Sequence, residues 1–122
     1  MVILHRSGER AFTLNGNHIA GLATPSHGAA QIEVWRTVFD AGSATPPHQH
    51  DTEEVVVVLR GTGRACIGDR EIRFQAGDTL ILPAGQVHQI FHDTDGEHIA
   101  AMPIGSRVTT PGGEPMELPW RA

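Results

Sequence analysis

Four side chains of this sequence have the types and spacing of a metal site: His48, His50, Glu54 and His88. A divalent metal holds imidazole nitrogen and carboxylate oxygen at about 2.0–2.2 Å, so the four side chains must converge on one small volume. His48 and His50 are two positions apart, and such residues point to the same face of an extended strand. These residue types in this pattern predict the binding of one divalent metal ion.

The chain must fold back on itself to bring Glu54 to the two histidines. Six residues of extended strand would carry Glu54 about 20 Å from His48. The polar residues after His50 are suited to a turn, and the apolar run Val55–Leu59 then predicts a strand that Glu54 begins. We therefore expect His48 and His50 to end one strand and Glu54 to start the strand beside it.

His88 comes from a different hairpin. The residues Pro83, Ala84 and Gly85 predict a turn, and a strand is expected over Gln86–His92. Alternation puts His88, Ile90 and His92 on one face of that strand.

At these residues the sequence resembles the cupin superfamily. Gly42, His48, His50, Glu54 and Gly61 match the first cupin motif, GX5HXHX3EX6G, and Gly77, Pro83, Gly85 and His88 match the second, GX5PXGX2H. His92 stands where the second motif usually has Asn. The match spans residues 42–92, under half of the chain, and its nine positions in order are specific for the fold and the metal site but not for the reaction.

The resemblance implies a single-domain, all-β cupin barrel, which is a jelly-roll-like double-stranded β-helix, and a homodimer. Three His and one Glu leave two of six octahedral positions for water, substrate or dioxygen. Open positions of this kind suit a catalytic metal better than a purely structural one. The ligand set accepts Fe(II), Mn(II), Ni(II), Co(II) or Zn(II). Because metal binding needs neutral imidazoles, we expect the metal to be released as the pH falls through about 6.

Three functions follow from such a site. In the first, a redox-active Fe, Mn or Ni makes the protein similar to cupin dioxygenases, which bind substrate and dioxygen; this is the leading hypothesis. In the second, a Lewis-acid metal polarises a carbonyl or hydroxyl in an isomerase, cyclase or lyase. In the third, the barrel is a binding or sensing module for a small molecule or metal. The ligand expected is small and partly apolar, such as an aromatic or carbonyl compound.

Two further residues are candidates for catalysis. His92 is expected on the same face of its strand as His88, four positions away. We expect it either to hydrogen-bond a metal-ligating residue or to act as a general base. The alternative is a surface residue at a strand end. Arg36 falls among aliphatic residues of one strand. It is either an anion-binding group at a pocket mouth or an ion-paired side chain whose stem covers apolar surface.

Composition narrows the remaining possibilities. The chain has 122 residues, 39% of them hydrophobic, and no apolar run of about 18 residues, so one domain and no membrane span are expected. All nine basic residues are scattered arginines and the net charge is -5, which argues against a nucleic-acid partner. The first residues lack a secretory signal pattern, and we expect the protein in the cytoplasm.

Short strands separated by Gly-rich turns dominate the chain, and no segment has a helical period. We expect an N-terminal arm over residues 1–29, the barrel over 30–104 and an irregular tail over 105–122. Met116, Leu118 and Trp120 alternate along this tail, which predicts that it lies extended against an apolar surface of the barrel or of a second copy. The strands expected are Ala11–Leu14, His18–Ala23, Gln31–Phe39, Glu54–Arg60, Arg64–Gly68, Arg70–Gln75, Thr79–Leu82, Gln86–His92 and Glu97–Ile104.

Overall fold

The structure is a computed structural model that describes residues 1–5 and 10–122. Nearly all of its regular structure is β-strand, as the sequence predicts, and the helices in the described residues are two single turns, η2 (Pro25–His27) and η3 (Pro119–Arg121). The strands are β1 (Ala11–Leu14), β2 (Asn17–Ala23), β3 (Ile32–Phe39), β4 (Gln49–His50), β5 (Glu54–Arg60), β6 (Gly63–Ile67), β7 (Arg70–Phe74), β8 (Thr79–Leu82), β9 (His88–His92), β10 (Gly96–Pro103) and β11 (Val108–Thr109).

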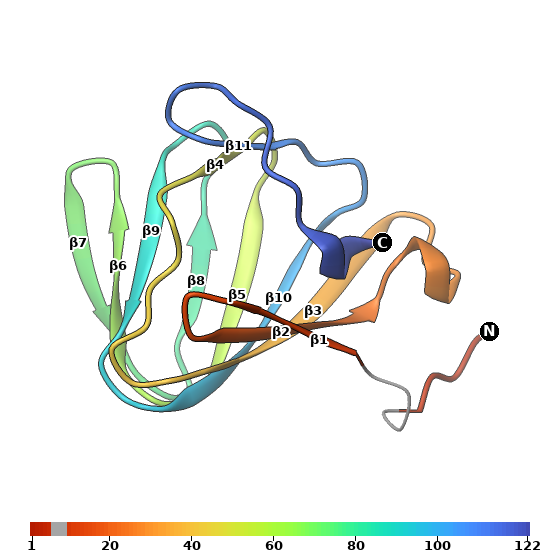
Figure 1. The fold of residues 1–122 in the computed structure, drawn as a ribbon, viewed down its shortest axis with the longest axis horizontal. Coiled ribbons are helices and arrows are strands. Elements are labelled where there is room, and N and C mark those ends of the chain that lie inside the picture. Colours follow the sequence, from red (N-terminus) through yellow and green to blue (C-terminus); the bar gives the residue numbers. More distant parts are fainter. Residues whose placement is uncertain (6–9) are drawn as a thin grey trace.

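Two antiparallel sheets enclose the interior (Figure 1). The larger has six strands in the order β1-β2-β3-β10-β5-β8, and the smaller has three in the order β7-β6-β9. A two-stranded ribbon of β11 and β4 lies at one end of the barrel. The apolar residues of the two inner faces form one core, in which burial of each large side chain contributes about 1.5–3 kcal/mol.

The N-terminal arm belongs to the barrel of its own chain. Asn15 and Gly16 have φ values of 50° and 79°, as a type I′ hairpin turn requires, and they join β1 to β2. Strand β2 then pairs with β3 along most of its length. The arm therefore completes the larger sheet.

The segment from Gly42 to His50 runs antiparallel to β9 and holds the first motif against the second. The Thr45 amide donates to the Ile90 carbonyl at 2.9 Å. His48 and His88 exchange both backbone hydrogen bonds, at 3.0 and 2.8 Å. This register places the two histidines directly opposite each other although 40 positions separate them in the sequence.

The C-terminal segment crosses the open end of the barrel (Figure 1). Strand β11 pairs with β4, so it is tied to the strand that contains His50. The chain then descends to η3, which packs against β1, β2 and β3. A Cβ atom at Gly21 of β2 would lie 2.5 Å from the carbonyl oxygen of Trp120, so only glycine permits this close approach.

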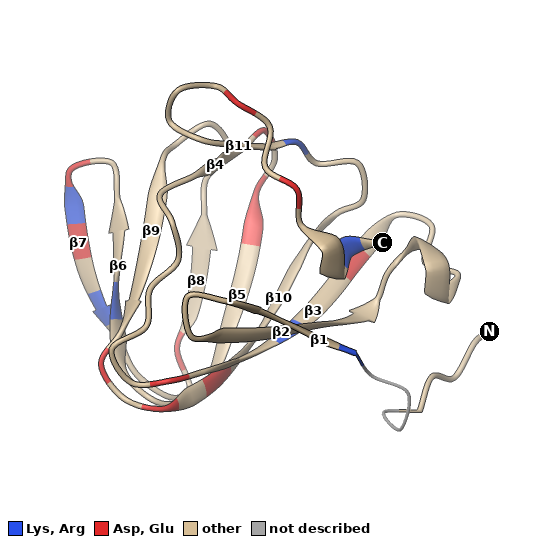
Figure 2. Cartoon of the chain, in the orientation of Figure 1, with Lys and Arg blue, Asp and Glu red and all other residues tan. Residues whose placement is uncertain are grey.

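Charged residues are dispersed over the fold. Figure 2 shows arginine on several separate elements and no continuous basic band among the residues it colours by charge. No helix in the described part of the chain is long and apolar enough to cross a membrane.

Candidate metal centre

His48, His50 and His88 converge at one end of the barrel interior. One ligand nitrogen from each lies within 4.8 Å of the other two. The Nε2 atoms of His48 and His88 are 3.1 Å apart, and a carboxylate oxygen of Glu54 lies 4.0 Å from Nε2 of His88. The structure thus brings together the three histidines that the sequence singled out as ligands, and it places the carboxylate of Glu54 beside one of them, His88.

A backbone hydrogen bond orients the first of these imidazoles. Nδ1 of His48 lies 2.7 Å from the carbonyl oxygen of Pro46. A carbonyl oxygen only accepts, so Nδ1 carries the proton and Nε2 presents its lone pair to the cluster. Pro46 therefore fixes the tautomer that a metal ligand needs.

Burial keeps the imidazoles uncharged. Desolvation, with a smaller contribution from the neighbouring histidines, lowers the pKa of His50 to about 3 and that of His88 to about 4. Desolvation also lowers the pKa of His48. Protons thus compete for these nitrogens only at a more acidic pH than the sequence alone suggested, so we now expect metal release below pH 6 rather than at it.

Glu54 is the buried acid of the cluster. Its side chain is almost fully enclosed, and desolvation raises its pKa to about 8, although the positive charge of Arg121 opposes the shift. A carboxyl group in this setting holds a proton at neutral pH unless a cation balances its charge. A divalent ion would supply that charge.

These residues fit a divalent metal. Two nitrogens bound about 2.1 Å from one ion at a right angle would be about 3 Å apart, and the Nε2 atoms of His48 and His88 are separated by 3.1 Å. The donor set of three neutral imidazoles and one carboxyl is one that first-row transition metals accept.

The cluster opens onto a small, mostly apolar cavity of about 70 Å³. His48, His50 and Glu54 form part of its wall. The tail contributes Met116, Leu118 and Trp120, so the apolar surface that the tail covers is the barrel's own, which settles the alternative left open by the sequence. The rest of the wall consists of Leu14, Asn17, Ile19, Trp35, Thr37, Thr45, Pro46, Ile90 and His98.

An ion pair anchors the tail over this cavity. Nε of Arg121 donates to the buried carboxylate of Glu33 at 2.5 Å, and its Nη2 donates to the Ser106 carbonyl at 2.8 Å. Desolvation raises the pKa of Glu33 while Arg121 lowers it, which is the pattern of a buried acid held by its partner.

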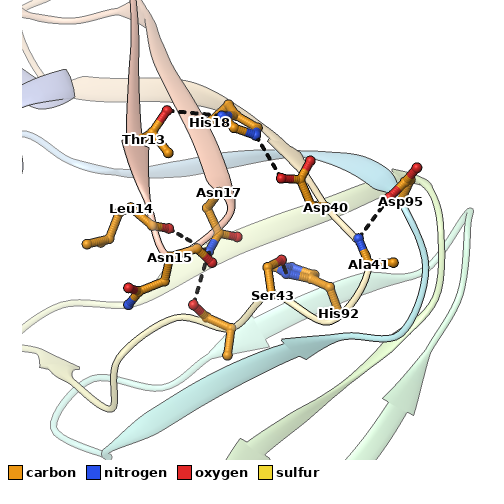
Figure 3. A network of polar contacts seen from close by, with 11 residues as sticks. Thr13, Leu14, Asn15, Asn17, His18, Asp40, Ala41, Ser43, His92 and Asp95 are labelled. Atoms are coloured by element: carbon orange, nitrogen blue, oxygen red, sulfur yellow. Dashed lines mark hydrogen bonds and ion pairs between the residues drawn. The ribbon is translucent and has the colours of Figure 1, made fainter.

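His92 points inward, as its parity predicts, but it does not contact the cavity. Its ring stacks on Phe39 with centroids 3.7 Å apart, and its Nδ1 is hydrogen-bonded to the Ser43 hydroxyl at 2.9 Å (Figure 3). The alternative of a surface residue is wrong, because only 2% of His92 is exposed. A general base must reach the substrate, and among the described histidines outside the metal cluster the one that lines this cavity is His98, from the next strand.

Arg36 lies on the face of β3 that points away from the cavity. The buried face of this strand carries Glu33, Trp35, Thr37 and Phe39. Arg36 instead approaches Glu97 of β10 at 3.8 Å on the outer face. The expectation that Arg36 binds an anion at the pocket mouth is corrected: both faces of β3 have apolar residues, and parity alone did not say which of them is inside.

Sequence reasoning missed several residues of the cavity wall. Trp35 and Thr37 share the parity of Phe39, a signal that was present but ambiguous. No local pattern in the sequence marks His98 or Asn17 as part of a site. Their place in the wall depends on how β2 and β10 pair with β3, which no local pattern reveals.

Comparison with known proteins places the chain among related sequences and folds. The family model described as "Cupin domain" matches residues 35–102. Auxin-binding protein 4 of Zea mays is 28% identical over 114 residues, which cover 85% of this chain and 56% of that protein. A gentisate 1,2-dioxygenase of Haloferax sp is 33% identical over 55 residues, which cover 45% of this chain and 15% of the dioxygenase.

Among solved structures, the polyketide cyclase RemF of Streptomyces resistomycificus superimposes with a TM-score of 0.77 at 21% identity. The match covers 91% of this chain and 85% of the cyclase. At this identity the likeness concerns the fold, and it confirms the double-stranded β-barrel. The chain spans about half the length of the auxin-binding proteins it matches.

Proposed function

This chain belongs to the cupin family, and from that premise we propose that it is a metal-dependent enzyme acting on a small, largely apolar organic molecule. One observation carries the proposal: three uncharged imidazoles cluster with a buried carboxyl beside a mostly apolar cavity, and His48, His50 and Glu54 form part of its wall. A purely structural metal site would not need to adjoin a cavity.

The protein's own residues have distinct tasks in this proposal. His48, His50, His88 and Glu54 hold the metal, and the carboxylate of Glu54 also balances its charge. The tail keeps bulk water away from the site. A bound metal would supply Lewis acidity or, where it is redox-active, the electron transfer that dioxygen chemistry requires.

We propose dioxygenation as the leading reaction, with iron, manganese or nickel in the site. The similarity to a gentisate 1,2-dioxygenase supports it, as does a cavity wall that suits an aromatic or carbonyl compound. The cavity of about 70 Å³ is smaller than the roughly 150 Å³ that accommodates benzene, so an aromatic substrate requires part of the tail to move aside.

Two other functions have support of their own. The relatives named auxin-binding proteins favour a non-catalytic module that binds a small molecule. The polyketide cyclase fold, matched over most of both chains, favours cyclase, isomerase or lyase chemistry at a Lewis-acid metal such as zinc or cobalt.

Elemental analysis of the purified protein, combined with oxygen uptake, separates these functions. About one Fe, Mn or Ni per chain, with oxygen consumed in the presence of a phenol or a diketone, is the expected result. Zinc or cobalt in the protein, with no oxygen consumed, would favour Lewis-acid chemistry or ligand binding instead. A protein that takes up no metal, even when each of the five ions is supplied, would refute the metal centre.

We also propose a cytoplasmic homodimer. The outer face of the six-stranded sheet carries exposed apolar side chains, among them Leu59 of β5 and Ile81 of β8. An exposed apolar sheet face of this kind is suited to a self-complementary contact with a second copy. Sedimentation velocity tests this: we expect a dimer that Ile81→Lys with Leu59→Lys converts to monomer, and a wild-type monomer at high concentration would contradict it.

A further inference from the structure

The cavity contains buried polar atoms that no group of the described chain satisfies. His98 is 6% exposed, and both of its ring nitrogens have no hydrogen-bond partner among the described residues. Asn17 is 1% exposed, and its Oδ1 has none among them either. A buried donor or acceptor left without a partner costs about 1–3 kcal/mol. Both side chains line the cavity next to the metal centre, so a group outside the chain is needed to satisfy them.

The orientation of the Asn17 amide is determined by its surroundings. Its Nδ2 donates to the carbonyl oxygens of Leu14, Asn15 and Ala44, at 3.0, 3.3 and 3.1 Å (Figure 3). A flipped amide would set its oxygen against three carbonyl oxygens, so Oδ1 must be the atom left free. Asn17 therefore offers the cavity an acceptor.

His98 offers the cavity both kinds of group. It lies on β10, paired with Thr37 of β3 and Val58 of β5, and its ring contacts the Phe39 and His92 rings from within the barrel. Burial lowers the pKa of His98 to about 3, so the ring is neutral, with one nitrogen donating and the other accepting. No arginine is among the described residues that form the cavity wall.

We propose that His98 and Asn17 form the polar end of the ligand site and bind a hydroxyl group of an uncharged, otherwise apolar molecule. The hydroxyl donates to Oδ1 of Asn17 and accepts from the N–H of His98. A carboxylate is disfavoured, because it cannot donate to Asn17 and no positive charge compensates it there. This inference rests on the proposed function, since the other end of the molecule would face the metal ligands.

A pair of probes of nearly equal size tests this: phenol, which has the hydroxyl, and toluene, which has a methyl group in its place. Trp35 and Trp120 are the only two tryptophans, and both line the cavity, so selective excitation of tryptophan reports binding. The protein is titrated with its metal bound, and the metal content of every sample is measured. We expect wild type to prefer phenol about thirtyfold, which is the effect of two hydrogen bonds at roughly fivefold each.

Substitutions at His98 test the contribution of this residue to binding without changing the metal-ligating residues. His98→Phe should keep only the roughly fivefold preference that the Asn17 hydrogen bond supplies, His98→Gln should retain more of the preference, and the change His5→Phe at an exposed position should behave as wild type. A phenol preference that is as large in His98→Phe as in wild type refutes the assignment, as does a wild type that does not discriminate or binds neither probe, which would mean that the groups are satisfied by water. If His98→Phe does not fold, a preference that is larger in His98→Gln than in His98→Leu still supports the assignment, and equal preferences refute it.

Failure of this inference is distinguishable from failure of the proposed function. If the protein binds its metal but does not discriminate the probes, the metal centre stands and the assignment of His98 and Asn17 is refuted. If the protein binds no metal but prefers phenol through His98, the assignment of His98 and Asn17 stands and the proposed metal-dependent enzyme is refuted.

Discussion

The burial of His98 predicts that acid destabilises the barrel through this residue. Its folded pKa of about 3 lies far below the ordinary value of 6.5, with desolvation as the main cause. Between these two values the unfolded chain takes up a proton on His98 and the folded chain does not. The stabilising contribution is therefore complete above pH 6.5 and is lost as the pH falls toward 3.

The magnitude follows from the size of this window. At pH 5, about 1.5 units below the unfolded pKa, protonation of His98 favours the unfolded state by about 2 kcal/mol, and at pH 7.5 the effect is close to zero. Replacing His98 by Phe removes this loss. The stability difference between wild type and variant should therefore change by about 2 kcal/mol between pH 7.5 and pH 5.

Urea unfolding of the metal-free proteins at both pH values measures this change. The difference between the two proteins is essential because Glu54, whose pKa is raised to about 8, acts in the opposite direction: its contribution falls as the pH rises from 4.5 to 8. Glu54 is present in both proteins, and its contribution cancels in the difference. His5→Phe, at an exposed position, serves as the control and should follow wild type. Equal pH dependence in wild type and His98→Phe would refute the assignment of a buried, neutral His98.

Three further predictions concern the metal and the tail. His50→Ala should abolish metal binding measured by elemental analysis, whereas His27→Ala should leave it intact; equal effects would count against the ligand assignment. Metal content after dialysis should persist at pH 6 and fall below it, since burial lowers the pKa values of the ligating imidazoles; loss already complete at pH 6 would contradict the burial argument. Arg121→Gln should lower the free energy of unfolding, measured in urea, by about 3 kcal/mol, because it leaves Glu33 buried without its partner. The same change should increase the quenching of Trp120 fluorescence by acrylamide. Unchanged stability and quenching would show that the tail is held by other contacts.

Much of the strand pattern was predictable because it is local. Period-two alternation, turn residues such as Asn15 and Gly16, and the apolar run Val55–Leu59 each act within a few residues, and the observed strands differ from the expected ones by one or two positions at most ends. The strand that ends at His50 was predicted as the neighbour of the strand that Glu54 begins, and this pairing is wrong: β4 pairs with β11, while β5 pairs with β10 and β8. Strand β11 was not predicted, because two residues are too few to carry a pattern.

The sequence by itself predicted which side chains cluster at the candidate metal centre. His48, His50, Glu54 and His88 occur in motifs whose spacing requires them to meet; the fold brings one ring nitrogen of each histidine within 4.8 Å of the others and a carboxylate oxygen of Glu54 to 4.0 Å from His88. The spacing carries this information because the turn and the strand parity between the ligands are set locally.

Only the tertiary structure decided what surrounds those ligands. The register of β3 against β2 and β10 turned Arg36 outward and His98 inward, and the three carbonyls around Asn17 left its oxygen without a hydrogen-bond partner in the described chain. The path of the tail brought Trp120 to the same cavity. Each of these placements depends on packing between segments far apart in the chain, and side-chain alternation specifies that a strand has two faces without specifying which one is buried.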